Sequence, residues 1–377
     1  MVLQHLKIYN LRCYDQAEVD LDSKFNVIIG LNGQGKTSLL ESIGLLSFFK
    51  SFRGAKNNEI LRLNQNEGRV SGKVSHEGLE FEIDVKVWPH RKQASFNGKS
   101  CKYLSEYVGK LSAVSFAPSD IEIIRGAPEN RRGWLDRLAQ IFSPTHVDDV
   151  SNYQKNLDQR NKLLREYASG RISQLGSEFD IWTEQLAFFG SKITANRIYA
   201  ARQSVSEIER HYERISNEKI PVILQYFREG FSEEESGQLD VSHDTFSTSE
   251  DYHSSLKNKL EVVLQKDRIL GSTSVGPHRD DLEVFMAGNL AKAFGSQGEV
   301  RSLMLAMRLA EVEKHKEVKG YSPLLLIDDF SSELDAKRRK FLLEYLTDSG
   351  SQVFLTTTEE VRLGKIFQVN EGRIVVQ

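Results

Sequence analysis

Two segments far apart in the chain carry side chains that could bind phosphate and a metal ion. The first, residues 30–37, is Gly-Leu-Asn-Gly-Gln-Gly-Lys-Thr, which matches the phosphate-binding pattern G-x-x-x-x-G-K-T. Its glycines let backbone N–H groups approach a phosphate, because no Cβ stands in the way. Lys36 would reach the β- and γ-phosphates of ATP, and the Thr37 hydroxyl would bind Mg²⁺. The alternative is an ordinary glycine turn before a chance Gly-Lys-Thr. The expected nucleotide-binding residues here are Gly30, Leu31, Asn32, Gly33, Gln34, Gly35, Lys36, Thr37 and Ser38.

The second segment ends in two aspartates. Residues 324–327 are Leu-Leu-Leu-Ile, typical of a buried strand, and Asp328 and Asp329 follow directly. The carboxyl ends of parallel strands share one edge of a sheet, so these carboxylates should lie beside the glycine segment. Asp328 would complete the Mg²⁺ shell, and Asp329 would orient or deprotonate the attacking water. With Lys36, Asp329 is an expected catalytic residue; the alternative for the pair is an acidic turn.

Several strands and one helix must position these residues. Residues 25–29 predict a buried strand, and an apolar helix should begin at Lys36. Alternating apolar residues over 68–102, with an Asn97–Gly98 turn, predict an antiparallel sheet beside this core. Residues 1–30 also have β character, and residues 113–116 and 352–358 predict two further buried strands.

The middle of the chain has the periodicity of packed helices. Apolar residues over 147–218 recur at steps of three and four, with Arg160 in the seam and a break at Ser169–Gly170. This pattern predicts two antiparallel helices, as a short helical arm or an ordinary helical subdomain. Residues 230–254 are rich in Ser, Glu, Asp and Gly and indicate a loop or irregular edge, and another helix should follow from residue 256.

Several arginines could contact phosphates or could simply be structural. Arg12 is expected as a second phosphate contact, against the alternative of a surface charge. Arg53 and Lys56 could face nucleotide or nucleic acid, or be solvated charges after a helix end. A third group could contact DNA phosphates or form ion pairs with nearby acids. This group consists of Arg125, Arg131, Arg132 and Arg137.

Composition narrows the class of protein. The 377 residues include 50 basic and 53 acidic ones, and a net charge of −3 argues against a uniformly basic nucleic-acid binder. Cys13 and Cys101 have no metal-binding spacing and predict reduced thiols. No apolar run is long enough for a membrane span, and no signal-peptide pattern is present. We therefore expect a cytoplasmic protein without a membrane partner.

A capping pattern precedes the aspartate-bearing strand. Ser296 and Glu299 have the spacing of a capping box, so a helix should begin there. ATP-binding-cassette proteins carry a Ser-x-Gly signature helix at this place, which binds the γ-phosphate held by another subunit. By this resemblance, Ser296 and Gly298 would contact nucleotide across a dimer. Residues 332–335 resemble the D-loop of the same proteins, and Thr357 or Thr358 would take the place of their switch residue.

Over nearly its full length the chain resembles the RecF family of bacterial DNA-repair ATPases, which is related to the heads of SMC proteins. Residues 275–282, Val-Gly-Pro-His-Arg-Asp-Asp-Leu, are especially specific to it. Glu299 departs from the usual glutamine of the family, and Cys13 from a commoner asparagine. The other segments that carry the resemblance are residues 11–14, 30–37, 116–120, 131–132, 135–136, 296–298 and 332–335.

The resemblance implies an α/β fold, an ABC-type P-loop ATPase head with a mixed sheet, a flanking antiparallel sheet and an α-helical arm domain. Residues 1–118 and 269–377 would form the head, and residues 119–268 the arm. It also implies an ATP-dependent homodimer that binds duplex DNA near gaps or junctions and is released by slow hydrolysis. RecO and RecR would be partners in replication restart and SOS induction. Alternatives are an SMC-like protein, a transporter ATPase subunit or another cassette ATPase.

Overall fold

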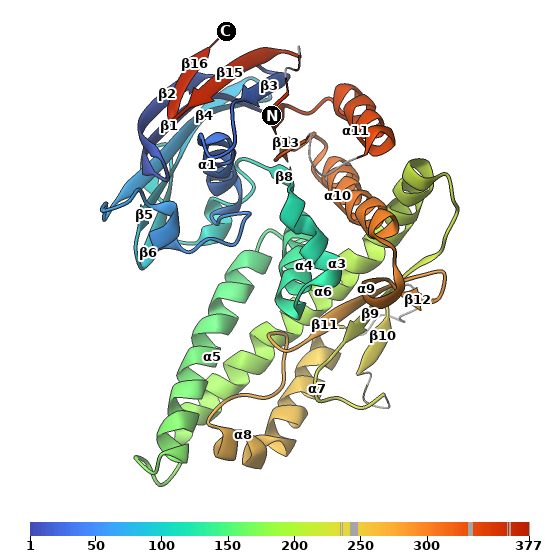
Figure 1. Ribbon diagram of the computed structural model, residues 1–377. Helices are drawn as coiled ribbons and strands as arrows, with labels where there is room; N and C mark the ends of the chain where they lie inside the picture. Colours follow the sequence, from blue (N-terminus) through green and yellow to red (C-terminus); the bar gives the residue numbers. More distant parts are fainter. Residues whose placement is uncertain are drawn as a thin grey trace. The chain divides into compact units, whose positions relative to one another are not determined.

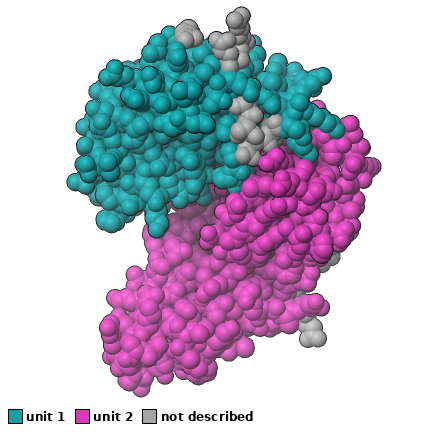
Figure 2. Space-filling view, in the orientation of Figure 1, with its two compact units in different colours: residues 1–120, 311–377 teal, residues 121–310 magenta. Residues whose placement is uncertain are grey.

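A computed structural model of the protein describes residues 1–233, 235, 237–241, 248–330, 335–359, 361 and 363–376. Its contacts divide the chain into two compact units, residues 1–120 together with 311–377, and residues 121–310 (Figure 2). The first unit is therefore built from both ends of the chain. The second unit extends to residue 310. The boundary expected at residue 269, where the second part of the head was to begin, therefore lies inside this unit. As a functional division, the three-part assignment stays a prediction.

The phosphate-binding segment follows a strand of a six-stranded sheet (Figure 1). The strand order is β16-β15-β3-β14-β13-β8; β15 and β16 are antiparallel, and the other neighbours are parallel. The bounds are β3 Phe25–Ile29, β8 Ala113–Phe116, β13 Leu324–Ile327, β14 Val353–Thr357, β15 Lys365–Asn370 and β16 Arg373–Val376. The strands predicted at 25–29, 113–116, 324–327 and 352–358 are confirmed, whereas β15 and β16 were not predicted. Because β3 and β13 run parallel, their carboxyl ends share an edge.

The alternating segment forms a second, antiparallel sheet, as predicted. Its order is β2-β1-β4-β5-β6-β7. The turn at Asn97–Gly98 joins β6 to β7, with φ of 47° and 75° at the two turn residues, as a two-residue hairpin requires. The bounds are β1 Val2–Leu11, β2 Tyr14–Asp20, β4 Gly68–His76, β5 Leu79–Trp88, β6 Arg91–Phe96 and β7 Lys99–Ser100.

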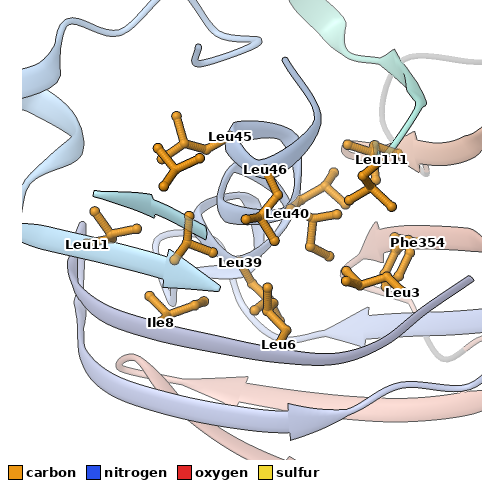
Figure 3. Packing of buried hydrophobic residues seen from close by; sticks show 14 of the residues in the cluster. Leu3, Leu6, Ile8, Leu11, Leu39, Leu40, Leu45, Leu46, Leu111 and Phe354 are labelled. Carbon is orange, nitrogen blue, oxygen red and sulfur yellow. The ribbon is translucent and has the colours of Figure 1, made fainter. Parts of the chain in front are cut away.

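Helix α1 (Lys36–Phe48) packs against residues of both sheets. Figure 3 shows its leucines beside Leu6 of β1 and Phe354 of β14. Leu39 and Leu46 are at most 2% exposed. Each such buried leucine stabilises the fold by roughly 1.5–3 kcal/mol. This packing fixes the amino end of α1, and with it the phosphate-binding segment.

Shorter elements complete the first unit. They are α2 Asn57–Ile60, two 3₁₀ turns at Leu104–Glu106 and Pro118–Ile121, and α11 Ala336–Asp348. Helix α10 (Gln297–Lys319) begins in the second unit and ends in the first.

The second unit contains the predicted helix pair. Helix α5 (His146–Ala168) ends at Ser169–Gly170, as expected, and contacts α6 (Ser177–Ser216). The 40-residue α6 also packs against α4 (Pro128–Phe142), α7 (Ser249–Val262) and β9 (Val222–Phe227). These contacts favour an ordinary helical subdomain over an isolated helical arm. The remaining helices are α3 Glu122–Arg125, α8 Leu264–Leu270 and α9 Ala291–Phe294.

A small sheet in the second unit was missed. Its order is β10-β9-β11-β12, with β10 Gln238–Asp240, β11 Asp281–Met286 and β12 Asn289–Leu290. Alternate residues of β9 and β11 are buried, so a period of two was present in the sequence. The two strands are far apart in the chain, however, and their pairing had no local indication. Part of the segment predicted as a loop, residues 230–254, forms β10 and the start of α7.

The arginines of the second unit serve mainly as internal partners. Arg160, in the predicted seam, is fully buried and donates to Asp267 at 2.9 Å. Arg131 is 4% exposed and forms two hydrogen bonds to the Asp281 carboxylate, at 2.7 and 2.8 Å. Arg132 donates to the carbonyl of Asp280 at 2.8 Å. For Arg131 and Arg132 the structure thus favours the internal role over DNA contact.

Residues 275–282, which were singled out in the sequence for their resemblance, contribute to the same polar interior. The Tyr226 hydroxyl donates to Asp280 at 2.9 Å, and Arg197 donates to the carbonyl of Pro277 at 2.7 Å. Arg197 also holds the Asp136 carboxylate through two bonds of 2.7 and 3.0 Å. Burial alone would raise the pKa of Asp136, but Arg197 and His146 outweigh burial and hold that pKa well below its usual range. Residues 275–282 therefore have a structural role, because they hydrogen-bond to side chains of other elements of the second unit.

Replacing Arg197 with methionine should lower the free energy of unfolding by about 3–5 kcal/mol, because Asp136 would remain buried without its main cation. Urea denaturation followed by circular dichroism measures this loss. The matched control is Arg210→Met on the same helix, where the exposed Arg210 pairs with the half-buried Glu207. We expect that control to cost about 0–1 kcal/mol. Equal urea midpoints for the two variants would contradict a stabilising role for the buried pair.

Candidate nucleotide site

The phosphate-binding segment requires glycine at two places for steric reasons. Gly35 has φ of 111°, and an added Cβ would lie 2.6 Å from Cys13 Sγ. At Gly30 an added Cβ would collide with the carbonyl oxygen of Val369 on β15. Among the described residues no side chain caps the start of α1 at Gly35. The first N–H groups of α1 are thus left for an anion, which the positive end of the helix dipole favours.

Lys36 lies folded against the segment that precedes it. Its Nζ donates to the carbonyls of Gly30 and Leu31, at 2.7 and 2.9 Å. Burial lowers the pKa of Lys36, while Asp329 and Asp328 act in the opposite direction. The ammonium group is therefore held at the mouth of the segment, near both aspartates. This is the position required of a cation that neutralises phosphate charge.

Thr37 and Asp328 meet, as the sequence predicted for a shared metal site. Thr37 Oγ1 donates to Asp328 Oδ1 at 2.8 Å, although the residues are 291 positions apart. Burial raises the pKa of Asp328, and hydrogen bonds from Thr37 and Thr356 partly offset this rise. A hydroxyl and a carboxylate oxygen are ligands that Mg²⁺ prefers. The chemistry of this pair therefore fits a magnesium ion, which Thr37 and Asp328 would hold.

Thr356 of β14 is a site residue that the sequence did not identify. Its Oγ1 donates to Asp328 Oδ1 at 2.9 Å and accepts from the backbone N–H of Asp329 at 2.8 Å. Thr357, which was expected as the switch residue with Thr358 as the alternative, accepts from the N–H of Glu359 at 3.0 Å. The choice between these two threonines stays a prediction. Hydroxyls at the end of this strand were predicted, but only the register of β14 beside β13 decides which one reaches the aspartates.

Asp329 has a left-handed backbone conformation, with φ of 52°. Few non-glycine residues adopt this conformation, and those that do concentrate at functional sites. The bond from its N–H to Thr356 helps to hold this conformation. Asp329 thus directly follows Asp328, the candidate metal-binding carboxylate, where an attacking water could be oriented.

Arg12 forms an ion pair with a carboxylate of the same chain. Its Nε and Nη2 donate to the Glu41 carboxylate at 2.7 and 2.9 Å, and Glu41 is 2% exposed. Ser51 donates to the same carboxylate and accepts from the N–H of Arg53. The Arg53 charge lies close enough to Asp328 to offset part of the rise that burial causes in the Asp328 pKa. Glu41 of α1 thus connects Arg12 with the segment that carries Arg53. The phosphate contact of Arg12 stays a prediction.

The remaining residues of the segment differ in their surroundings. Gln34 accepts from the N–H of Glu371 at 2.7 Å through its side chain, and from Gly372 at 3.1 Å through its carbonyl. Ser38 hydrogen-bonds Cys13. Leu31 and Asn32 are exposed, and Leu31 is 75% exposed. Burial raises the pKa of the Cys13 thiol.

Ser296 and Glu299 form the predicted capping box. The N–H of Ser296 donates to Glu299 Oε2 at 2.7 Å, and Ser296 Oγ accepts from the N–H of Glu299 at 3.2 Å. The hydrogen bonds from Ser296 lower the pKa of Glu299. Glu299 thus completes the cap at the start of α10. Gly298 lies in the first turn of α10.

Part of the predicted D-loop lies outside the described residues, namely residues 332–334. Asp335 is described and caps α11 by accepting from the N–H of Arg338 at 2.9 Å. The parts of the chain that the structure describes contain no helix that is both long and apolar enough for a membrane span.

Comparisons with known proteins identify the family. The model of the RecF/RecN/SMC N-terminal domain matches residues 2–372. The DNA replication and repair protein RecF of Myxococcus xanthus is 34% identical, over 95% of this chain and 91% of the relative. The RecF protein of Geotalea uraniireducens is 33% identical over the full length of both chains. The chain belongs to the RecF family.

Solved structures agree with this assignment. A structure of the recombination mediator protein RecF with ATP, in the RecFOR pathway, has a TM-score of 0.87 at 30% identity, covering 100% of this chain and 97% of the other. An SMC head domain from Pyrococcus furiosus has a TM-score of 0.52 at 15% identity, with 100% and 96% covered, which shows the shared fold. The predicted fold class, an ABC-type ATPase head with a mixed sheet, is thus confirmed. The relatives are described as DNA replication and repair proteins, which agrees with the general role predicted from the sequence.

Proposed function

We propose that this RecF-family chain is an ATP-gated DNA-binding protein of recombinational gap repair. The observation that carries the proposal is the hydrogen bond between Thr37 and Asp328, which joins the phosphate-binding segment to the aspartate-bearing strand. The relatives named above support the pathway, since one is described as a recombination mediator bound to ATP. RecO and RecR are the proposed partners, with roles in replication restart and SOS induction.

In this proposal ATP binds through the N–H groups of residues 33–37, and Lys36 shifts from the Gly30 carbonyl to the phosphates. When bound, Mg²⁺ would supply positive charge that neutralises the phosphates. Thr37 and Asp328 would hold that ion, and Thr356 would keep Asp328 in place. Asp329 would orient the water that attacks the γ-phosphorus, as the bond from that phosphorus to the ADP oxygen breaks. Hydrolysis should be slow and should be stimulated by DNA.

ATP would also join two copies of the chain. The start of α10, with Ser296 and Gly298, would bind the γ-phosphate held by the partner. Closing the dimer would bring two weakly basic surfaces together around duplex DNA near a gap or junction. This gating is compatible with a net charge of −3, since neither copy alone needs high affinity for DNA.

The test uses Asp329→Asn and light scattering with and without ATP and a gapped duplex. The variant should hydrolyse ATP about 100-fold or more slowly, the usual contribution of a positioned acid–base group. It should still bind ATP, so the mass should remain at twice the 42.9 kDa of one chain for as long as ATP is present. Wild-type protein should return to the single mass as ATP is consumed. A single mass under every condition, for both proteins, would contradict ATP-driven dimerisation.

A further inference from the structure

We propose that one edge of the antiparallel sheet is a contact surface for the phosphate backbone of duplex DNA. The surface, here called the basic rim, consists of Arg91, Lys92, Lys99, Lys102 and Lys110. It lies on β6, β7 and the segment that follows them (Figure 1). The inference rests on the proposed DNA-binding function and assigns a location to it.

The local charge of this segment departs from that of the whole chain. Acidic residues outnumber basic ones overall, at 53 against 50. Residues 85–105, however, contain five lysines and arginines and no acidic residue. A concentrated basic segment in a slightly acidic protein is the electrostatic pattern of a polyanion-binding surface.

Two tight turns place these cations along one edge. The β5–β6 turn pairs Trp88 with Arg91, and the β6–β7 turn pairs Phe96 with Lys99. Arg91 and Lys99 therefore lie at opposite ends of β6, about 16 Å apart at the usual rise of an extended strand. A single small anion would reach one or two of these groups. The phosphates of duplex DNA, one per about 3.4 Å of helix axis on each strand, extend over this distance and could reach several of them.

Aromatic rings support the cationic side chains. The guanidinium carbon of Arg91 lies 4.4 Å from the ring centre of Trp88, and Lys110 Nζ lies 4.7 Å from that of Phe96. Lys92 Nζ lies 5.2 Å from the ring centre of Phe49, and Lys102 Nζ lies 5.3 Å from that of Tyr103. Such contacts hold the aliphatic stems in place and leave the charges able to meet an anion.

The rim lacks the acidic partners that other strands of the same sheet provide. Lys7 of β1 pairs with Glu18 at 2.9 Å, Arg62 pairs with Asp15 at 3.0 Å, and Arg69 of β4 pairs with Asp84. None of the five rim residues forms an ion pair with any residue that the structure describes.

Lys92 also has a cation as a neighbour. Burial lowers the pKa of Lys92 to about 8, and Lys50 adds to this effect. Two neighbouring cations repel each other, and a phosphate placed between them would remove this repulsion. An anion should therefore bind more favourably at the rim than at an isolated surface lysine.

The test neutralises three exposed rim residues together, Arg91→Gln, Lys99→Gln and Lys102→Gln. Fluorescence anisotropy with a labelled gapped duplex and ATP is recorded between about 50 and 200 mM salt. Losing three phosphate contacts should reduce the slope of log affinity against log salt by about 2.7, and should weaken binding at least about tenfold at the low-salt end. ATP binding and the ATP-dependent mass should match wild type, which separates this inference from the proposed ATP cycle.

Two comparison variants complete the design. Lys24→Gln, Lys219→Gln and Lys266→Gln remove the same charge from exposed lysines elsewhere, and this variant should bind DNA like wild type. Arg91→Lys, Lys99→Arg and Lys102→Arg keep the charge and should also bind normally. The inference is overturned if the neutralised rim binds with wild-type affinity and salt slope, or if both neutral variants lose the same affinity. If wild-type protein with ATP binds no DNA, the proposed function itself fails.

Discussion

Replacing Lys36 with alanine is expected to remove most nucleotide binding, with a Kd that rises roughly 30- to 5,000-fold. This range corresponds to the 2–5 kcal/mol lost when one partner of a buried charge-assisted contact is deleted. Lys36 Nζ is held at the mouth of the loop by the Gly30 and Leu31 carbonyls, and from there it would shift to the phosphates. Its charge also has no local substitute on the loop, because residues 30–35 contain no other cation.

Isothermal titration calorimetry with ATP and Mg²⁺ measures the change. The matched control is Lys24→Ala, an exposed lysine that directly precedes β3 in the same unit. That control should bind ATP normally, and both variants should keep the wild-type circular dichroism spectrum. An affinity of Lys36→Ala within threefold of the control would show that the loop binds nucleotide without its lysine, or that the site lies elsewhere.

Replacing Ser296 with arginine is the second change with a large expected effect. It should leave ATP binding by the single chain intact and abolish ATP-dependent dimerisation. The reason is that Ser296 caps the start of α10, where a long cationic side chain would occupy the space proposed for the phosphate of the partner copy. The helix dipole would be opposed as well, since a cation is unfavourable at a helix amino end.

Ser296→Ala separates this effect from the loss of the cap. Both variants remove the capping hydroxyl, which costs about 1 kcal/mol, but only arginine adds bulk and charge. Light scattering with ATP should therefore show a doubled mass for Ser296→Ala and a single mass for Ser296→Arg. A doubled mass for Ser296→Arg would show that α10 does not face the partner copy.

The local sequence determined much of this protein. The loop at residues 30–37, the Asn97–Gly98 hairpin and the capping box at Ser296 could be predicted because each depends on residues a few positions apart. The strand before Asp328 could be predicted for the same reason, since four consecutive aliphatic residues indicate a buried strand. Turn chemistry, capping and periodicity act over short distances along the chain.

Tertiary structure alone decided which distant groups meet. Thr356 reaches Asp328 through the register of β14 beside β13, and Arg12 finds Glu41 across the start of α1. The pairing of β9 with β11 and of Arg131 with Asp281 likewise joins segments that carry no local mark of their partners. The sequence does not distinguish an arginine that binds a carboxylate from one that binds a phosphate. Its partner is fixed only when packing brings the two groups within hydrogen-bond distance and removes the water between them.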